Sequence, residues 1–314
     1  MSLITLYVAL LATAITAAER NADPYPSFLG TTATKGAATF TFRGQNVFLS
    51  GANLAWINYG NDFGNNQTNG QKCMLRSYVR NVSKAGGNSL RVWLFVEGTA
   101  IPAFDESGNV VGTDASDTMR AELVDLARYA ASVNVFLVLC LWNGAVLKNS
   151  DSGYLGLLTD DAKLTTFFDK ALSPLVTALK DEPGIGAWEV INEPEGSIAI
   201  ASVPSQPCFD TEAVLDGSGA GWSGAEIPIQ TFQSFVNKHA ACIHAADPKA
   251  LVTVGSWSQY SATNAVLPGG KKFFNYWKDT CLEAVRCVCV CAPLSRSLSL
   301  SLSFSLSLSL SLSL

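Results

Sequence analysis

The segment Trp188–Gly196 (WEVINEPEG) holds the residues best suited to chemistry. It is an apolar run that ends in Asn192-Glu193-Pro194. Proline cannot donate to a strand ladder, so the run predicts a buried strand that stops before Pro194. This strand would deliver the Glu193 carboxylate at its carboxyl end, where barrels of parallel strands carry their catalytic groups. The Asn192 amide beside it could orient a substrate hydroxyl, an arrangement that favours the acid/base position of a glycosidase.

Retaining hydrolysis of a glycoside needs two carboxylates roughly 5–5.5 Å apart. Glu193 is the predicted proton donor, because burial beside aromatic side chains would raise its pKa as general-acid work requires. The alternative is a loop carboxylate without a catalytic role. Glu189, in the same strand, would face either the barrel interior or the helices, and Glu195 is expected at the rim. Arg91 follows another strand and could hold a carboxylate by bidentate hydrogen bonds, or form a purely structural ion pair.

Other chemistries fit the sequence poorly. His239 and His244 lie five residues apart in one helical pattern, a spacing that does not make a metal pair, and neither suits a Ser-His-Asp hydrolase. Gly219–Gly224 matches G-x-G-x-x-G but follows no strand. We expect no metal and no cofactor, because two carboxylates and water suffice. The loop from Cys208 to Pro228 is expected to wall the substrate cleft, with Trp222 as a sugar platform.

The elements that must position these residues alternate along the chain. From about residue 40, short apolar runs separate longer amphipathic stretches, which predicts a parallel sheet covered by helices. The runs are nearly all apolar, as expected for strands with both faces buried. Strands are expected at 47–53, 89–94, 135–141, 185–191 and 251–255. Helices are expected at 70–85, 117–132, 160–179 and 231–246, and a hairpin over 39–47 turns at Arg43-Gly44.

Residues at the strand ends favour a (β/α)8 TIM barrel over a doubly wound sheet. Each predicted strand is followed by aromatic or polar residues: Trp56, Trp93, Trp142 and Trp257, with Asn53, Arg91, Asn143 and Glu193. Such convergence on one rim is how a (β/α)8 barrel builds a site, and flat aromatic faces suit the C–H faces of sugars. The alternative for any one tryptophan is that it caps the barrel interior. Only five strand-helix units are visible, so the predicted barrel is incomplete.

The net charge and the N-terminal segment indicate which partners and which cellular compartment to expect. The net charge of -5, without a basic stripe, argues against nucleic acid as a partner. Residues 1–18 are apolar and end in small residues, which predicts a secretory signal and a secreted, extracellular protein; the alternative is a buried N-terminal helix. No internal stretch is apolar enough to span a membrane, and we expect a monomer.

The eight cysteines fit an oxidising compartment. Cys140 lies in an apolar run and is expected to be a buried thiol. Four others are candidates for disulfides whose pairing the sequence leaves open: Cys73, Cys208, Cys242 and Cys281.

Residues 285–314 differ from the rest of the chain. Three alternating cysteines are followed by a Ser/Leu alternation from Leu294 to Leu314, a low-complexity pattern without turn signals. We interpret this tail as non-native sequence, with a genuine C-terminal extension as the alternative. The partial TIM-barrel glycosidase domain is therefore assigned to residues 19–284.

Four segments together resemble glycoside hydrolase family five: Trp188–Gly196 (WEVINEPEG), Ser89–Leu94 (SLRVWL), Leu141–Ala145 (LWNGA) and Val47–Asn53 (VFLSGAN). More narrowly, residues 23–283 resemble the secreted endo-β-1,4-mannanases of molluscs and other invertebrates. The resemblance implies a (β/α)8 barrel and retaining hydrolysis of β-1,4-mannosidic bonds in mannan. The runner-up activities are hydrolysis of another β-1,4-glucan, and carbohydrate binding without catalysis.

The resemblance also assigns roles to residues. It implies that Glu193 is the acid/base, that Asn192 binds the sugar 2-hydroxyl, that Arg91 supports the nucleophile, and that Trp142 and Asn143 contact substrate. The family's nucleophilic glutamate follows the seventh strand and its histidine-tyrosine pair follows the sixth. This chain stops resembling the family before either, so no nucleophile is predicted within it. We therefore expect the polypeptide to be unstable and inactive, a truncated product.

Overall fold

The computed structural model describes residues 29–34, 37–145, 153–214, 226–257, 259–264 and 273–285. They fall into two units, which divide between Phe48 and Leu49 and are described separately. The predicted signal at 1–18, the sugar platform Trp222 and the Ser/Leu repeat of the tail lie outside the described residues.

The N-terminal unit is a three-stranded antiparallel sheet in the order β1-β2-β3. Its strands are β1 (Gly30–Thr34), β2 (Ala37–Phe42) and β3 (Gln45–Val47). Phe42 pairs with Gln45 across a two-residue turn, in which Arg43 (φ 50°) and Gly44 (φ 71°) are both left-handed. A turn with two left-handed residues matches the twist of the flanking strands, which confirms the predicted hairpin. The strand β1 was not predicted from the sequence.

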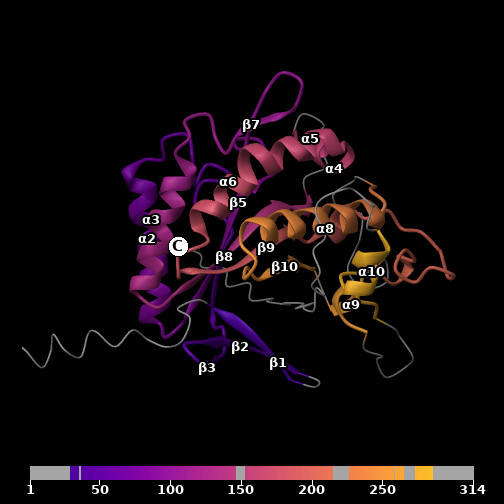
Figure 1. Cartoon of the computed structure of the whole chain (residues 1–314), viewed down its shortest axis with the longest axis horizontal. Helices are drawn as coiled ribbons and strands as arrows, with labels where there is room; N and C mark the ends of the chain where they lie inside the picture. Colours follow the sequence, from indigo (N-terminus) through magenta and orange to yellow (C-terminus); the bar gives the residue numbers. More distant parts are fainter. Residues whose placement is uncertain are drawn as a thin grey trace, which may run out of the picture. The chain divides into compact units, whose positions relative to one another are not determined.

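The second unit is built on a five-stranded parallel sheet in the order β10-β9-β8-β5-β4 (Figure 1). Its strands are β4 (Gly51–Leu54), β5 (Ser89–Val96), β8 (Phe136–Asn143), β9 (Ile185–Asn192) and β10 (Val252–Gly255). All five predicted strands are present in the predicted order. Because the strands are parallel, their carboxyl ends meet at one edge of the sheet, which brings the candidate residues together.

Helices connect the successive parallel strands and lie side by side in a row (Figure 1). Along this row α2 (Asn69–Lys84) contacts α3 (Met119–Ser132), α3 contacts α6 (Ser173–Leu179), and α6 contacts α8 (Ile229–Ala246). Helix α2 begins at a capping box, in which Thr68 and Gln71 exchange side-chain and backbone hydrogen bonds. Each helix matches a predicted one. Within the described ranges, no helix combines the length and the apolar character needed to cross a bilayer.

The helix predicted at 160–179 is divided into three parts. Asp160 caps α5 (Asp161–Phe167), a π-helical turn follows over Phe168–Leu172, and α6 then begins at Ser173. Pro174 lacks the N–H that a regular helical bond to residue 170 would need, which gives a physical reason for the change in hydrogen bonding there.

Several short elements carry no periodic signal and were not predicted. They are the hairpin β6 (Ala103–Phe104) and β7 (Val110–Gly112), the helices α4 (Gly153–Thr159) and α9 (Gln259–Ala262), and the 3-10 turn η3 (Pro194–Ser197). The last described segment ends in the short helix α10 (Asp279–Ala284).

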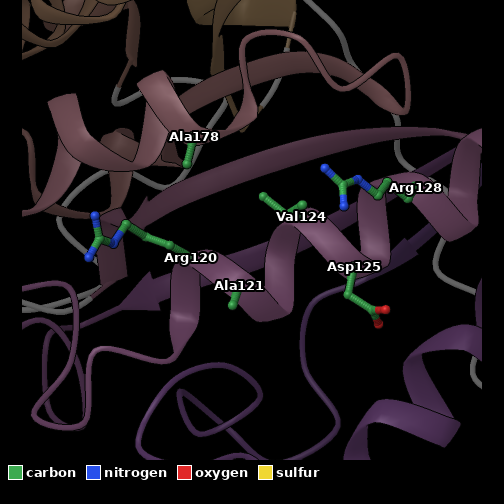
Figure 2. A pocket seen from close by; sticks show the side chains of 6 residues that line it. All are labelled: Arg120, Ala121, Val124, Asp125, Arg128 and Ala178. Carbon is green, nitrogen blue, oxygen red and sulfur yellow. The ribbon is translucent and has the colours of Figure 1, made fainter.

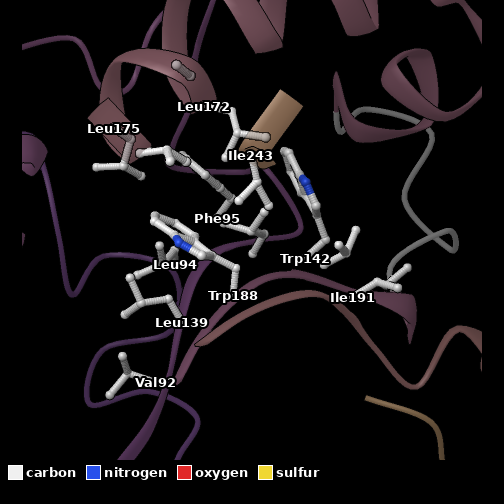
Figure 3. Packing of buried hydrophobic residues seen from close by; sticks show 14 of the residues in the cluster. Val92, Leu94, Phe95, Leu139, Trp142, Leu172, Leu175, Trp188, Ile191 and Ile243 are labelled. Atoms are coloured by element: carbon white, nitrogen blue, oxygen red, sulfur yellow. The ribbon is translucent and has the colours of Figure 1, made fainter. Parts of the chain in front are cut away.

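The core lies between the sheet and the row of helices. Alternate residues of each strand point into it, and Figure 3 shows Leu139 and Trp188 of the sheet among Leu172, Leu175 and Ile243 of the helices. The pleat sends the intervening residues of the same strands to the opposite face of the sheet. That opposite face carries the candidate site.

Candidate active site

Arg91 of β5 forms the floor of the site. Its Nε and Nη2 atoms donate to the two carboxylate oxygens of Glu189 in β9, at 2.7 and 2.5 Å, and Nη1 donates to Asn53 Oδ1 at 2.9 Å. Burial alone would lower the pKa of Arg91, but the charge of Glu189 and its hydrogen bonds raise it above its usual value. The predicted bidentate grip on a carboxylate is therefore present. A Cβ at Gly255 would overlap Glu189 Oε1, so the pair needs a glycine in β10.

The same arginine orients the predicted substrate-binding amides. Arg91 Nη2 donates to Asn192 Oδ1 at 2.8 Å, and Asn192 Nδ2 donates to Asn143 Oδ1 at 3.2 Å. Asn143 Nδ2 in turn donates to Glu97 Oε1 at 2.8 Å, and Glu97 also accepts a hydrogen bond from the Tyr59 hydroxyl. The chain of contacts joins the ends of β5, β8 and β9 and fixes both amides by their partners. The structure thus brings Arg91, Asn192 and Asn143 together.

Glu193 follows β9 in the left-handed conformation (φ 47°, ψ 55°). A non-glycine residue adopts this conformation only where the surroundings enforce it, and such residues cluster at functional sites. Two neighbours enforce it here: the Glu193 N–H donates to Gly255 O at 2.5 Å, and Gly144 packs so closely that a Cβ would overlap Glu193 O. The turn lifts the Glu193 side chain to a half-buried position at the strand end.

The environment of Glu193 favours its protonated form. Burial is the main cause of its raised pKa, and the negative charge of Glu195 adds to it. Arg91 and a side-chain hydrogen bond from Asn192 act in the opposite direction without cancelling the increase. A carboxyl group with a raised pKa keeps its proton to higher pH, which is the property of a general acid.

Glu195 was predicted at the rim, and this prediction is wrong. Its side chain is fully buried and accepts hydrogen bonds from Ser256 Oγ at 2.6 Å, Ser261 Oγ at 2.7 Å and the Trp257 N–H at 3.0 Å. The turn η3 directs the carboxylate toward the segment after β10, where Trp277 also covers it. The sequence around Glu195 carries no sign of these partners, which come from residues more than sixty positions later.

Three of the predicted aromatic residues lie near the strand ends. Trp56 and Trp257 are 42% and 48% exposed, so part of each side chain is accessible to solvent. Trp93 was expected to present its ring at the rim, but it is buried against Trp56, with ring centroids 5.4 Å apart edge to face, and its ring lies 5.3 Å from the Arg91 guanidinium. Tyr59 adds a further exposed ring at 4.8 Å from Trp56. Trp56 and Tyr59 thus form an aromatic patch supported by Trp93.

Trp142 was predicted to contact substrate, but it lies in the core. It is fully buried, stacks on Tyr154 at 4.7 Å and on Phe95 at 5.2 Å, and donates from Nε1 to His239 Nε2 at 3.1 Å. The strand alternation breaks at the end of β8, where Leu141 and Trp142 both join the helix-facing cluster. The position after the strand therefore did not place this ring at the rim.

Sequence reasoning missed Glu97 and Tyr59. Glu97 directly follows the apolar strand β5, as Glu193 follows β9, so the same rule applied to Ser89–Val96 would have found it. Tyr59 lies in a loop fixed by Asp62, which accepts hydrogen bonds from two backbone N–H groups, and no periodic pattern marks it.

A surface hollow between α3 and α6 is separate from these residues (Figure 2). It is lined by Arg120, Ala121, Val124, Asp125, Arg128 and Ala178. Arg120 pairs with Asp117 and Arg128 with Glu182, so its cations already have partners within the chain. Among the described residues, no group of three or more histidine, cysteine or acidic side chains could hold a metal ion.

The structure also settles one disulfide. Cys208, before α8, is bonded to Cys281 in α10, 73 residues later. Cys140 is a buried thiol, as predicted, and its pKa is raised mainly by burial. Cys73 and Cys242 are free thiols, so these two candidates do not pair.

The chain is similar in sequence to proteins of known activity. The chain is 42% identical to mannan endo-1,4-beta-mannosidase of Cryptopygus antarcticus over 257 residues, and 42% identical to that of Mytilus edulis over 241 residues. These matches cover 82% and 77% of this chain, and the chain spans only 65% and 64% of the length of the two relatives.

A solved structure gives the same result. The endo-1,4-beta-mannanase from Eisenia fetida superposes with a TM-score of 0.73 at 43% identity, covering 82% of this chain and 68% of that one. No protein-family model matches the chain. The chain belongs to the invertebrate endo-1,4-β-mannanases of glycoside hydrolase family five, and its five-stranded parallel sheet is part of their (β/α)8 barrel.

Proposed function

We propose that this chain carries the proton-donating half of a secreted endo-acting β-1,4-mannan hydrolase with a retaining mechanism. The single observation behind the proposal is Glu193, which is held in a left-handed turn at the end of β9 with a raised pKa. The relatives named mannan endo-1,4-beta-mannosidase supply the substrate class.

In this mechanism Glu193 protonates the glycosidic oxygen as the bond to the leaving sugar breaks. A carboxyl group with a raised pKa can carry that proton near neutral pH, and after the first step the same group takes a proton from the attacking water. The Gly255 O and Gly144 contacts hold its backbone, so the proton is delivered from a fixed position. Preorganisation of this kind lowers the barrier because no reorganisation is needed during the reaction.

Asn192 supplies the contact to the sugar 2-hydroxyl. Its Oδ1 is engaged by Arg91, and its Nδ2 donates to Asn143 and to Glu193, so a sugar 2-hydroxyl would bind Asn192 in place of one of these two acceptors. Arg91 thus acts on substrate through Asn192. The exposed faces of Trp56 and Trp257 serve as platforms for sugar rings.

The second carboxylate of the retaining pair is the missing part. Near Glu193, the described carboxylates already have partners: Glu189 holds Arg91, Glu195 holds two serines, and Glu97 holds Asn143. Residues 284–314 contain neither Asp nor Glu. Without a nucleophile no glycosyl-enzyme forms. We therefore propose that these 314 residues bind β-1,4-mannan without hydrolysing it.

Secretion is supported by two features. Residues 1–18 have the composition of a signal, and the Cys208–Cys281 disulfide is of a kind that persists in oxidising compartments. Mass spectrometry of the protein from a eukaryotic secretion host would show a new N-terminus near residue 19 in the medium. Retention of the intact chain inside the cells would contradict this.

Binding and hydrolysis by the 314-residue chain test the proposal directly. Isothermal titration should give saturable binding of mannohexaose that exceeds binding of cellohexaose, and chromatography should detect no shorter products. Glu193→Gln should remove a carboxyl resonance that titrates above the ordinary glutamate range in NMR, whereas the exposed Glu106→Gln should not. Absence of mannohexaose binding would reject the substrate class. If the chain hydrolyses mannohexaose and Glu193→Gln abolishes that hydrolysis, the proposal that the chain lacks a nucleophile would be rejected.

A further inference from the structure

Glu195 is a buried carboxylate without a cationic partner among its described contacts. It is fully buried, and all its hydrogen-bond donors are neutral: two serine hydroxyls, one backbone N–H and one indole N–H. A buried charge is costly to desolvate unless hydrogen bonds replace its water, so this site is built to hold a carboxylate. Such a group is retained where its contacts serve a purpose beyond packing.

These contacts tie the segment after β10 to the segment after β9. Ser256 Oγ and Ser261 Oγ donate to Oε1, while the Trp257 N–H donates to Oε2 at 3.0 Å. The two serine hydroxyls also contact each other at 2.8 Å. One carboxylate therefore fixes both flanks of Trp257.

The same two segments are joined again at the proton donor. The Glu193 N–H donates to Gly255 O at 2.5 Å, next to Ser256. The hydrogen bond of Glu193 to Gly255 and that of Trp257 to Glu195 lie only two residues apart along each segment, so together they fix Glu193 and the Trp257 backbone relative to each other. The Trp257 backbone is anchored in this frame while its ring remains 48% exposed.

We propose that Glu195 is a positioning residue that holds Trp257 as a sugar platform at a fixed place relative to Glu193. This inference rests on the proposed function, since it gives Trp257 a glycan ligand. Glu195 itself does not touch substrate, because it is fully buried. An aromatic face on a fixed backbone binds a sugar with less loss of conformational entropy than one on a free loop.

The alternative is that Glu195 only stabilises the fold. A double-mutant cycle on the 314-residue chain separates the two, with mannohexaose affinity as the readout and the variants Glu195→Ala, Trp257→Ala and their combination. If Glu195 acts through Trp257, Glu195→Ala weakens binding about tenfold in the wild-type background. The same change then has no further effect once Trp257 is replaced by alanine. Additive losses would overturn the proposal, because they show that Glu195 acts elsewhere.

Glu195→Gln is the conservative variant in this experiment. Its amide oxygen can still accept from the Trp257 N–H, and the two serine hydroxyls can accept from its NH2 group, so only the long contact from the Trp277 indole N–H at 3.5 Å is lost. Wild-type affinity is therefore expected for Glu195→Gln. If Glu195→Ala does not fold, Ser261→Ala replaces it, removes one donor, and is expected to weaken binding by less.

A measurement made without sugar distinguishes failure of the positioning proposal from failure of the proposed function. The indole N–H resonance of Trp257 is identified by its absence in Trp257→Ala. It should shift or broaden in Glu195→Ala and return toward its wild-type position in Glu195→Gln. If the wild-type chain binds no mannohexaose, the proposed function fails, while this shift still supports the positioning of Trp257. An unchanged resonance in Glu195→Ala would overturn the positioning itself.

Discussion

Replacement of Arg91 by methionine should be among the most damaging single changes in the molecule. The Arg91 and Glu189 side chains are 17% and 5% exposed, so their ion pair is largely removed from water. Arg91 donates two hydrogen bonds to the Glu189 carboxylate, and the Cys140 thiol also hydrogen-bonds to this carboxylate. Without the guanidinium, Glu189 becomes a buried carboxylate with little compensation. Breaking a buried pair in this way costs about 3–5 kcal/mol.

A surface pair provides the matched control. Arg120 makes a two-pronged contact with Asp117, but these side chains are 40% and 68% exposed. Exposed pairs contribute about 0–1 kcal/mol, so Arg120→Met should barely change stability. Urea denaturation at pH 7, followed by circular dichroism, would give the free energy of unfolding of both variants.

The combined replacement Arg91→Met with Glu189→Leu tests the electrostatic reasoning itself. It removes both charges, so stability should return to within about 1–2 kcal/mol of wild type, because apolar pairs can replace buried ion pairs. Binding of mannohexaose should stay weak, since Asn192 loses the donor that fixes its Oδ1. If Arg91→Met costs no more than Arg120→Met, or if the combination is no better than Arg91→Met alone, the reasoning is refuted.

Three further changes test other parts of the structure. Burial lowers the pKa of His239 to about 3, so between pH 6.5 and 3 only the unfolded chain gains a proton there. Stability should thus fall with decreasing pH by about 1.4 kcal/mol per unit from this group, a slope that urea titrations should not find in His239→Phe. Opening the Cys208–Cys281 bond by serine substitution should cost up to about 4 kcal/mol by loop-closure entropy, measured against Cys73→Ser as an unaffected control in thermal melts. Burial raises the pKa of Asp114, but its backbone hydrogen bonds outweigh this and lower it. Its contribution is therefore present above the ordinary aspartate pKa and lost as the pH falls through the folded value, so Asp114→Asn should destabilise more at pH 7 than at pH 3; equal losses would contradict this.

The parts of the fold that could be predicted are those with a local signal. The strands β5, β8 and β9 are predominantly apolar runs, and the helices of the row have a helical period, so these elements were found near their true bounds. The carboxylate contact of Arg91 was also predicted, because the guanidinium suits bidentate hydrogen bonds to a carboxylate, although Arg91 lies within β5 and does not follow it. The short hairpin β6–β7 and the turn η3 have no period and depend on neighbours distant in sequence.

Two of the misplaced residues, Trp142 and Glu195, share a physical cause. Trp142 was expected at the rim because it follows the predicted strand 135–141, but β8 continues to Asn143 and the ring packs among Phe95 and Tyr154. For Glu195, a charged residue after a proline resembles a solvated loop, but Ser256 and Ser261 arrive from another element and bury it. In both cases the outcome depends on partners supplied by tertiary structure, which single-sequence patterns do not contain.

The acid half of the site is self-supporting, and this makes the binding experiments meaningful. Arg91 comes from β5, Asn143 from β8, Asn192 from β9 and Gly255 from β10, and these residues make the contacts that hold the Asn192 amide and the Glu193 N–H. None of these contacts needs a second carboxylate to be formed. If these 314 residues lack a nucleophile, as proposed above, they would still hold the proposed proton donor and the two amides in place. Under that proposal the chain should bind the glycan without cleaving it. Glu193 should still have a raised pKa, because the groups that raise it are present in the chain.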